Sequence, residues 1–113
     1  EGILPGGGTA LAFAAQQDWE MSLNAGGLLG LAILKDALAA PFTKILQNGG
    51  LEPKDYTLDK WGEGIDVTSG SKKIMIDTGI IDPLLVTKSA LNNAISVATT
   101  ILSTDCVISN VRE

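Results

Sequence analysis

Apolar residues recur at helical spacing in three stretches of this chain. The first runs from Thr9 to about Asp18, the second follows Asn24, and the third runs from Pro83 to about Leu102. The apolar positions of the second are Leu28, Leu31, Leu34, Leu38, Phe42, Ile45 and Leu46, and those of the third are Val86, Ala90, Ala94, Val97, Ala98 and Ile101. This periodicity predicts a mainly α fold.

Helix start and stop signals flank the second and third stretches. Asn24 is a plausible N-cap for the second helix, Pro41 is expected to kink it, and Asn48-Gly49-Gly50 is expected to end it. Asp82 is the expected N-cap of the third helix, with Pro83 at its first helical position.

The remaining segments are more polar or too short for long helices. Residues 52–70 predict an irregular excursion with at most one short helical turn, within which residues 64–70 form a short hairpin. Residues 72–76 predict another helical turn, which Gly79 ends. Residues 106–111 predict a closing edge strand that pairs with a missing part of the protein or with a neighbouring subunit.

Length and charge narrow the class of protein. The chain has 113 residues, enough for one modest core, and its 45% hydrophobic content is high for an independent domain of that size. We therefore expect a piece of a larger protein. Its net charge of −5, with basic residues spread along the chain, argues against nucleic acid or an anionic membrane as a partner. The apolar run from Ala25 to Leu34 is shorter than a membrane-spanning helix requires.

The chain has no histidine, and Cys106 is its only cysteine. A histidine-activated serine or cysteine nucleophile is therefore excluded, as are most zinc sites. A lone cysteine forms no intrachain disulfide, which favours a reducing compartment. Cys106 itself is best interpreted as a small apolar strand residue.

The glycine run at residues 6–8 lies between an extended segment and the first helix. Glycines there allow positive φ and let a phosphate approach the backbone, and the helix start offers unpaired N–H groups to an anion. A tight turn without any ligand explains the same run. No Gly-Lys-Ser/Thr follows it, and Leu11 occupies the place of a third Rossmann glycine.

Three motifs in this order resemble one known family. They are residues 1–11 (EGILPGGGTAL), 79–83 (GIIDP) and 86–91 (VTKSAL). The chain resembles the C-terminal part of the equatorial domain of a group I chaperonin, the GroEL family, over residues 1–113. The Gly64-Ile65-Asp66-Val67 segment also resembles group II chaperonins.

The resemblance implies a fold, an activity and partners. The fold would be a helical fragment of the equatorial, ATP-binding domain, with a short β-hairpin and a C-terminal edge strand. The full-length protein would be a chaperonin ATPase that uses ATP with Mg²⁺, forms a homo-oligomeric double ring, and works with a co-chaperonin on unfolded polypeptide clients. It would be cytoplasmic in a bacterium, or else lie in a mitochondrial matrix or plastid.

The resemblance also assigns site residues. Gly7 corresponds to the family's glycine at the nucleotide, Asp66, Val67 and Thr68 to a loop beside the base, and Asp82 to a carboxylate near the ribose and base. Many bacterial members carry Asn-Ala-Ala where this chain has Asp66-Val67-Thr68. The phosphate-cradling loop and the metal-binding aspartate would lie upstream, so the isolated chain is not expected to hydrolyse ATP.

Each of these positions has a purely structural interpretation as well. Gly7 fits a turn that needs positive φ, Asp82 a helix N-cap, Asp66 a turn, and Val67 and Thr68 ordinary strand neighbours. Two other functions stay open, a small independent nucleotide- or phosphate-binding protein and a helical interaction module.

Overall fold

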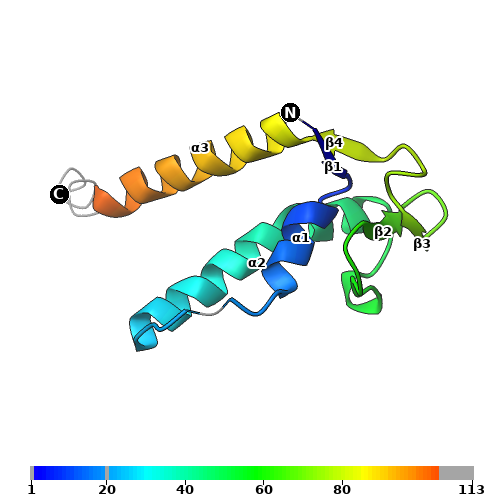
Figure 1. The fold of residues 1–113 in the computed structure, drawn as a ribbon. Coiled ribbons are helices and arrows are strands. Elements are labelled where there is room, and N and C mark those ends of the chain that lie inside the picture. Colours follow the sequence, from blue (N-terminus) through cyan, green and yellow to red (C-terminus); the bar gives the residue numbers. More distant parts are fainter. Residues whose placement is uncertain (1, 20, 105–113) are drawn as a thin grey trace. The chain divides into compact units, whose positions relative to one another are not determined.

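The computed structural model describes residues 2–19 and 21–104, and its order of elements is mainly helical (Figure 1). The elements are β1 (Ile3–Pro5), α1 (Thr9–Gln16), α2 (Ala25–Asn48), the 3-10 turn η1 (Pro53–Asp55), β2 (Glu63–Asp66), β3 (Ser71–Ile74), β4 (Ile81–Pro83) and α3 (Leu84–Ser103). The mainly α fold with a short hairpin is confirmed. The predicted edge strand at residues 106–111 lies outside the described residues.

The chain divides into two compact units. One comprises Ile3–Asp82, and the described part of the other consists of Gly2 and residues 83–104. The first unit holds the buried core and all the predicted site residues. The second consists mainly of α3.

The predicted ends of α2 are confirmed. The Asn24 side chain accepts a hydrogen bond from Gly27 N at 2.8 Å, which satisfies one of the free amides at the helix start. Pro41 lies inside α2, and the helix continues to Asn48. Gly49 follows as the C-cap, and Gly50 has φ +79°, the left-handed conformation in which glycine commonly ends a helix.

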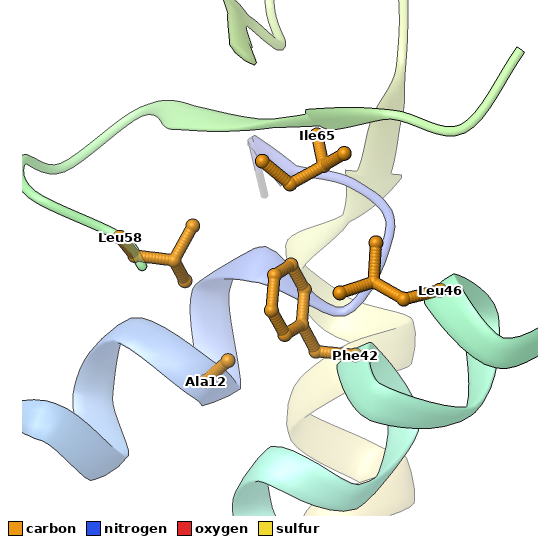
Figure 2. Close-up of a cluster of buried hydrophobic side chains, with 5 residues drawn as sticks. All are labelled: Ala12, Phe42, Leu46, Leu58 and Ile65. Carbon is orange, nitrogen blue, oxygen red and sulfur yellow. The ribbon is translucent and has the colours of Figure 1, made fainter. Parts of the chain in front are cut away.

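The core of the first unit forms where α1 packs against the C-terminal half of α2. Figure 2 shows the Phe42 ring in the middle of this cluster. Its buried members are Ala12, Phe42, Leu46, Leu58 and Ile65. They come from both helices, the irregular segment and β2, so the core ties together regions that are far apart in the sequence.

The N-terminal half of α2 is less buried than its pattern predicts. Leu28 is exposed, as is Leu34, whereas Leu38 is buried. The reason is the length of α1, which has only eight residues. It starts beside Phe42, and Lys35 Nζ already donates to the Gln17 carbonyl beyond its end, at 2.9 Å. The turns of α2 before Lys35 therefore extend past the end of α1 and do not pack against it.

The hairpin is longer than the sequence indicates. β2 pairs with β3 in an antiparallel register that runs from Glu63 opposite Ile74 to Asp66 opposite Ser71. The Asp66 carbonyl accepts from Ser69 N and Gly70 N, which closes the turn over residues 67–70. The prediction of a helical turn at residues 72–76 is wrong, because cross-strand pairing with β2 makes most of this segment a strand.

β1 pairs with β4 in a second two-stranded sheet. Beyond the strands, Gly6 N donates to the Ile80 carbonyl at 2.8 Å. This bond ties the glycine run to the residues just before Asp82. Segments some 75 positions apart in the sequence are thereby joined at the place where the family resemblance puts a nucleotide.

α3 begins at Leu84, whose N–H donates to the Gly2 carbonyl at 2.9 Å. The helix is the strongest prediction from the sequence; its existence is confirmed, and each end lies one residue later than predicted. None of its residues is buried. Val86, Val97 and Ile101, on the predicted apolar face, are all more than half exposed.

α2 is long and apolar enough to cross a membrane, judged by length and composition alone. Core helices of globular proteins pass the same test. α2 also carries Lys35, Asp36 and Lys44, and it supplies Phe42 and Leu46 to the core. The C-terminal half of α2, with Leu38, Phe42 and Leu46 buried, therefore acts as a core helix of the first unit.

Candidate functional site

The glycine turn is pressed between α2 and the segment before β4. Gly7 and Gly8 have φ of +71° and +76°, a conformation that residues with a Cβ rarely adopt. A Cβ on Gly8 would lie 2.6 Å from Phe42 N, and one on Gly6 would lie 2.9 Å from the Ile80 carbonyl carbon. The turn therefore requires glycine for backbone conformation and for close packing, whether or not a ligand binds there.

Met75 connects the glycine turn to the hairpin. Its side chain is completely buried. A Cβ on Gly7 would lie 3.3 Å from Met75 Cε, and a Cβ on Gly64 would lie 2.8 Å from Met75 Cγ. The two glycines thus face the same side chain from the α1 side and from β2.

The backbone of Met75 extends this connection to Ile80, the residue before β4. Its N–H donates to the Gly62 carbonyl, and its carbonyl accepts from Ile80 N, both at 3.0 Å. One residue therefore touches or bonds to each segment that carries a predicted site residue. Met75 is not among the residues predicted from the sequence, where its only signal is an isolated apolar triplet, Ile74-Met75-Ile76, between charged residues.

Thr9 follows the glycine turn and has an unusual environment. It is fully buried, and its hydroxyl has no hydrogen-bond partner among the described residues. A Cβ on Gly64 would lie only 2.5 Å from Thr9 Oγ1. The close approach of β2 to the start of α1 therefore depends on Gly64.

Asp66 organises the hairpin turn. Its Oδ1 accepts hydrogen bonds from Thr68 N at 3.0 Å and from Thr68 Oγ1 at 2.6 Å. Its Oδ2 lies 3.3 Å from Lys73 Nζ. The hydrogen bonds from Thr68, with a smaller contribution from Lys73, hold the pKa of the Asp66 carboxyl below its usual value. The carboxylate is therefore ionised at neutral pH.

Val67 anchors the same turn to the core. It packs against the core cluster, and a Cβ on Gly49 would lie 3.0 Å from Val67 Cβ. Thr68, in contrast, is exposed. The loop of Asp66, Val67 and Thr68 is thus fixed to the end of α2 on one side and faces solvent on the other.

The prediction that Asp82 caps α3 is wrong. Asp82 lies in β4, and the N-cap is Pro83, which has φ −67° and ψ 132° and makes no side-chain cap bond. The proline ring fixes φ, and Pro83 takes an extended ψ, so the helix begins one residue later than predicted. This shift places Asp82 one position too far from the free amides of the helix start.

Without a capping role, Asp82 is left with an unpaired carboxylate. The residue is half-buried, and within the part of the chain that the structure describes its side chain makes no hydrogen bond or ion pair. Buried or half-buried polar groups usually have a partner. Asp82 therefore has spare acceptor capacity, a state that it shares with the half-buried Glu63 on β2.

The predicted site residues thus fall into two groups. Gly7 and Asp82 belong to the segments joined by the Gly6–Ile80 hydrogen bond. Asp66, Val67 and Thr68 lie two to four residues beyond Gly64, which meets Gly7 across Met75. Among residues 2–19 and 21–104, no three acidic or sulfur ligands gather as a metal site.

A hollow of about 280 Å³ lies elsewhere, between α1, α2 and η1. Its lining includes Ala12, Lys35, Thr43, Pro53 and Tyr56 but none of the predicted site residues. The hydrogen-bonded and unpaired polar groups described above point to the glycine turn, not to this hollow.

Comparison with known proteins gives two findings. The sequence profile of the TCP-1/cpn60 chaperonin family matches residues 1–112. The chain is 43% identical to a protein described as "Chaperonin GroEL, chloroplastic" from Cyanidium caldarium, over 97% of this chain and 22% of that protein. The chain therefore spans about a fifth of the length of this relative, and it belongs to the TCP-1/cpn60 chaperonin family.

Proposed function

We propose that this chain forms one wall of the ATP pocket in the equatorial domain of a chaperonin. The carboxylate of Asp82 carries the proposal. It is half-buried and has no partner among the described residues, yet it is held on a strand whose neighbour leads into the glycine turn. A carboxylate in this state is suited to accept hydrogen bonds from the hydroxyl groups of a ribose.

The glycine turn supplies the second element of the wall. Gly7 is half-buried, and Met75 Cε fills the side on which a Cβ would stand, so a ribose or phosphate would approach the remaining accessible part of its backbone. The loop of Asp66, Val67 and Thr68 is the third element, and we assign it to the base. Its exposed Thr68 and its fixed backbone leave polar groups accessible on the solvent side.

Phosphoryl transfer requires metal and positioning groups around the γ-phosphate. In our proposal, residues outside this chain supply the phosphate loop and the Mg²⁺ ligands. The chain alone should therefore bind ATP weakly at best and should not hydrolyse it. Hydrolysis, the homo-oligomeric double ring, the co-chaperonin and the unfolded clients belong to the full-length protein in this proposal.

The compartment is also a proposal. The relative from Cyanidium caldarium is described as chloroplastic, which supports the plastid alternative over a bacterial cytoplasm. The lone cysteine fits either location.

The test uses a full-length chaperonin subunit that carries this chain as its corresponding segment. Asp82→Asn removes the charge while keeping the shape, and we expect ATP affinity to fall about tenfold because a charge-assisted hydrogen bond is lost. Asp77→Asn is the matched control, since Asp77 is exposed and lies five residues earlier. Isothermal titration calorimetry gives the affinities. Equal affinities for both variants and the parent would contradict the proposal.

A further inference from the structure

Two adjacent lysines on β3 form ion pairs with different partners. Lys72 Nζ lies 2.6 Å from Asp59 Oδ2, and Lys73 Nζ lies 3.3 Å from Asp66 Oδ2. Successive residues of a strand point to opposite faces, so these two side chains leave β3 on different sides. Only Lys73 reaches the turn of Asp66, Val67 and Thr68.

The two ion pairs also differ in exposure. The Asp59 side chain is 68% exposed, whereas that of Asp66 is 15% exposed. Exposed ion pairs contribute little because water screens both charges. The Asp66 side chain is less exposed than that of Asp59, and its charge therefore depends more on the groups that face it.

The two carboxylate oxygens of Asp66 have different partners. Oδ1 accepts both hydrogen bonds from Thr68, so the direction of the carboxylate sets the position of the Thr68 amide. Oδ2 faces Lys73. A movement of Oδ2 rotates the carboxylate and thereby disturbs the turn that we assign to the base.

We propose that Lys73 is a positioning residue of the nucleotide site: its ammonium group holds the Asp66 carboxylate against Thr68 and offsets its negative charge. The turn then has a fixed conformation, and the charge of Asp66 is neutralised by Lys73 when a nucleotide binds beside it. Without Lys73, an uncompensated carboxylate lies on the same pocket wall as an anionic ligand. This inference rests on the proposed function.

The hairpin register also determines where Lys73 lies relative to the glycine turn. In the register of the hairpin, Lys73 lies opposite Gly64, which has no side chain. Gly64 is also the residue that adjoins Met75 and Thr9. The lysine therefore lies directly across from the point at which the hairpin meets the glycine turn.

The experiment measures the affinity for ATP of a full-length chaperonin subunit that carries this chain. Lys73→Met should weaken ATP binding about two- to fivefold, the range expected for one partly screened ion pair. Lys72→Met is the matched control, with the same change of charge on the adjacent residue, and should leave the affinity unchanged. Lys73→Arg should retain the parent affinity, because guanidinium also pairs with a carboxylate.

A double-mutant cycle separates positioning from direct attraction of the nucleotide. In an Asp66→Asn background the ion pair is already absent, so adding Lys73→Met should cause no further loss. If Lys73 attracts the phosphates directly, the loss will persist in that background, and this result would overturn the proposal. Lys73→Gln serves as a second neutral variant should Lys73→Met fail to fold.

The outcomes distinguish this inference from the proposed function. Equal affinities of the Lys73→Met and Lys72→Met subunits, alongside a clear loss for Asp82→Asn, would overturn the role of Lys73 alone. No effect of either Asp82→Asn or Lys73→Met would overturn both. The expected result is a loss of affinity for Asp82→Asn and for Lys73→Met, with the parent affinity retained by Lys73→Arg.

Discussion

The Ile3–Asp82 unit and α3 show how differently a similar apolar pattern can be used. In Ile3–Asp82, Phe42 and Leu46 are buried, and the glycine turn adjoins backbone and side chains at contact distance. α3 is equally regular as a helix, but Leu102 is 79% exposed and no residue of the helix is buried in the described chain. Helical periodicity predicts that a helix forms. Whether its apolar face is buried depends on which other segments pack against it.

The difference also separates two kinds of residue. In Ile3–Asp82, replacing a glycine or a core leucine should affect stability through atoms that are in contact. In α3, the same kinds of replacement should affect only the intrinsic preference of the helix. The following predictions test that contrast, from the largest expected effect to the smallest.

Gly8→Ala should destabilise the Ile3–Asp82 unit most. A Cβ there would lie 2.6 Å from Phe42 N at φ +76°, so both steric overlap with backbone and strain oppose it. We expect a loss of about 3 kcal/mol or more in the free energy of unfolding. Urea unfolding monitored by fluorescence of Trp19 and Trp61, which both lie in this unit, gives the value.

Gly30→Ala is the control for this change. Gly30 lies inside α2 with nothing within 4 Å of a built Cβ. Alanine should therefore stabilise the helix by about 0.5 to 1 kcal/mol. Similar losses from Gly8→Ala and Gly30→Ala would show that the close contact with Phe42 is not what requires glycine.

Leu46→Ala should cost about 2 to 5 kcal/mol, because it removes apolar contacts and leaves a cavity in a nearly fully buried position. Leu102→Ala in α3 should change stability by less than about 0.5 kcal/mol. Thermal unfolding by circular dichroism and tryptophan fluorescence measures both. A loss of stability from Leu102→Ala as large as that from Leu46→Ala would contradict the contrast between the two helices.

Thr9→Val should make the Ile3–Asp82 unit more stable by about 1 kcal/mol. The Thr9 hydroxyl is buried without a partner among the described residues, and an unpaired buried polar group carries a desolvation cost. Valine has nearly the same shape without that group. A loss of stability in urea unfolding would indicate that the hydroxyl has a partner, such as an ordered water.

The smallest expected effect is a dependence on pH confined to the hairpin region. Hydrogen bonds from Thr68 lower the pKa of Asp66 below 3.8, and the hydrogen bond and charge of Lys72 lower that of Asp59. A lowered carboxyl pKa means that the folded state favours the ionised form. Both pairs should therefore support the hairpin above about pH 4, and this support should be lost as the pH falls further.

Backbone amide shifts of Thr68 followed by NMR between pH 6 and pH 2 would report the change at Asp66. α3 contains no carboxyl group, so its own amide shifts provide the internal control. A midpoint for Thr68 above pH 4 would contradict the assigned hydrogen bonds.

Sequence reasoning succeeded where a structure is set by neighbours in the chain. The Asn24 cap, the Gly49-Gly50 stop and, to within one residue at each end, the range of α3 depend on local signals and agree with the prediction. The helical turn predicted at residues 72–76 is wrong, because the pairing of β3 with β2 is not visible in the residues of β3 alone. Met75 was missed for the same reason.

The candidate site shows the same division. Gly7 was recognised from a local glycine run, and its positive φ is confirmed. The prediction that Asp82 is the N-cap of α3 is wrong by one residue, because Pro83 occupies the N-cap position. The Asp66–Lys73 ion pair depends on the hairpin register and could not be predicted while residues 72–76 were assigned to a helix. The nucleotide contacts themselves stay a prediction.

The position of Met75 gives the chain a built-in spectroscopic reporter. The sequence contains two methionines, and the other, Met21, is 55% exposed. The ε-methyl group of Met75 lies against Gly7 in a buried environment. Selective carbon-13 labelling of methionine methyl groups should therefore yield one signal with solvent-like shift and one that is sensitive to any ligand or backbone movement at the glycine turn.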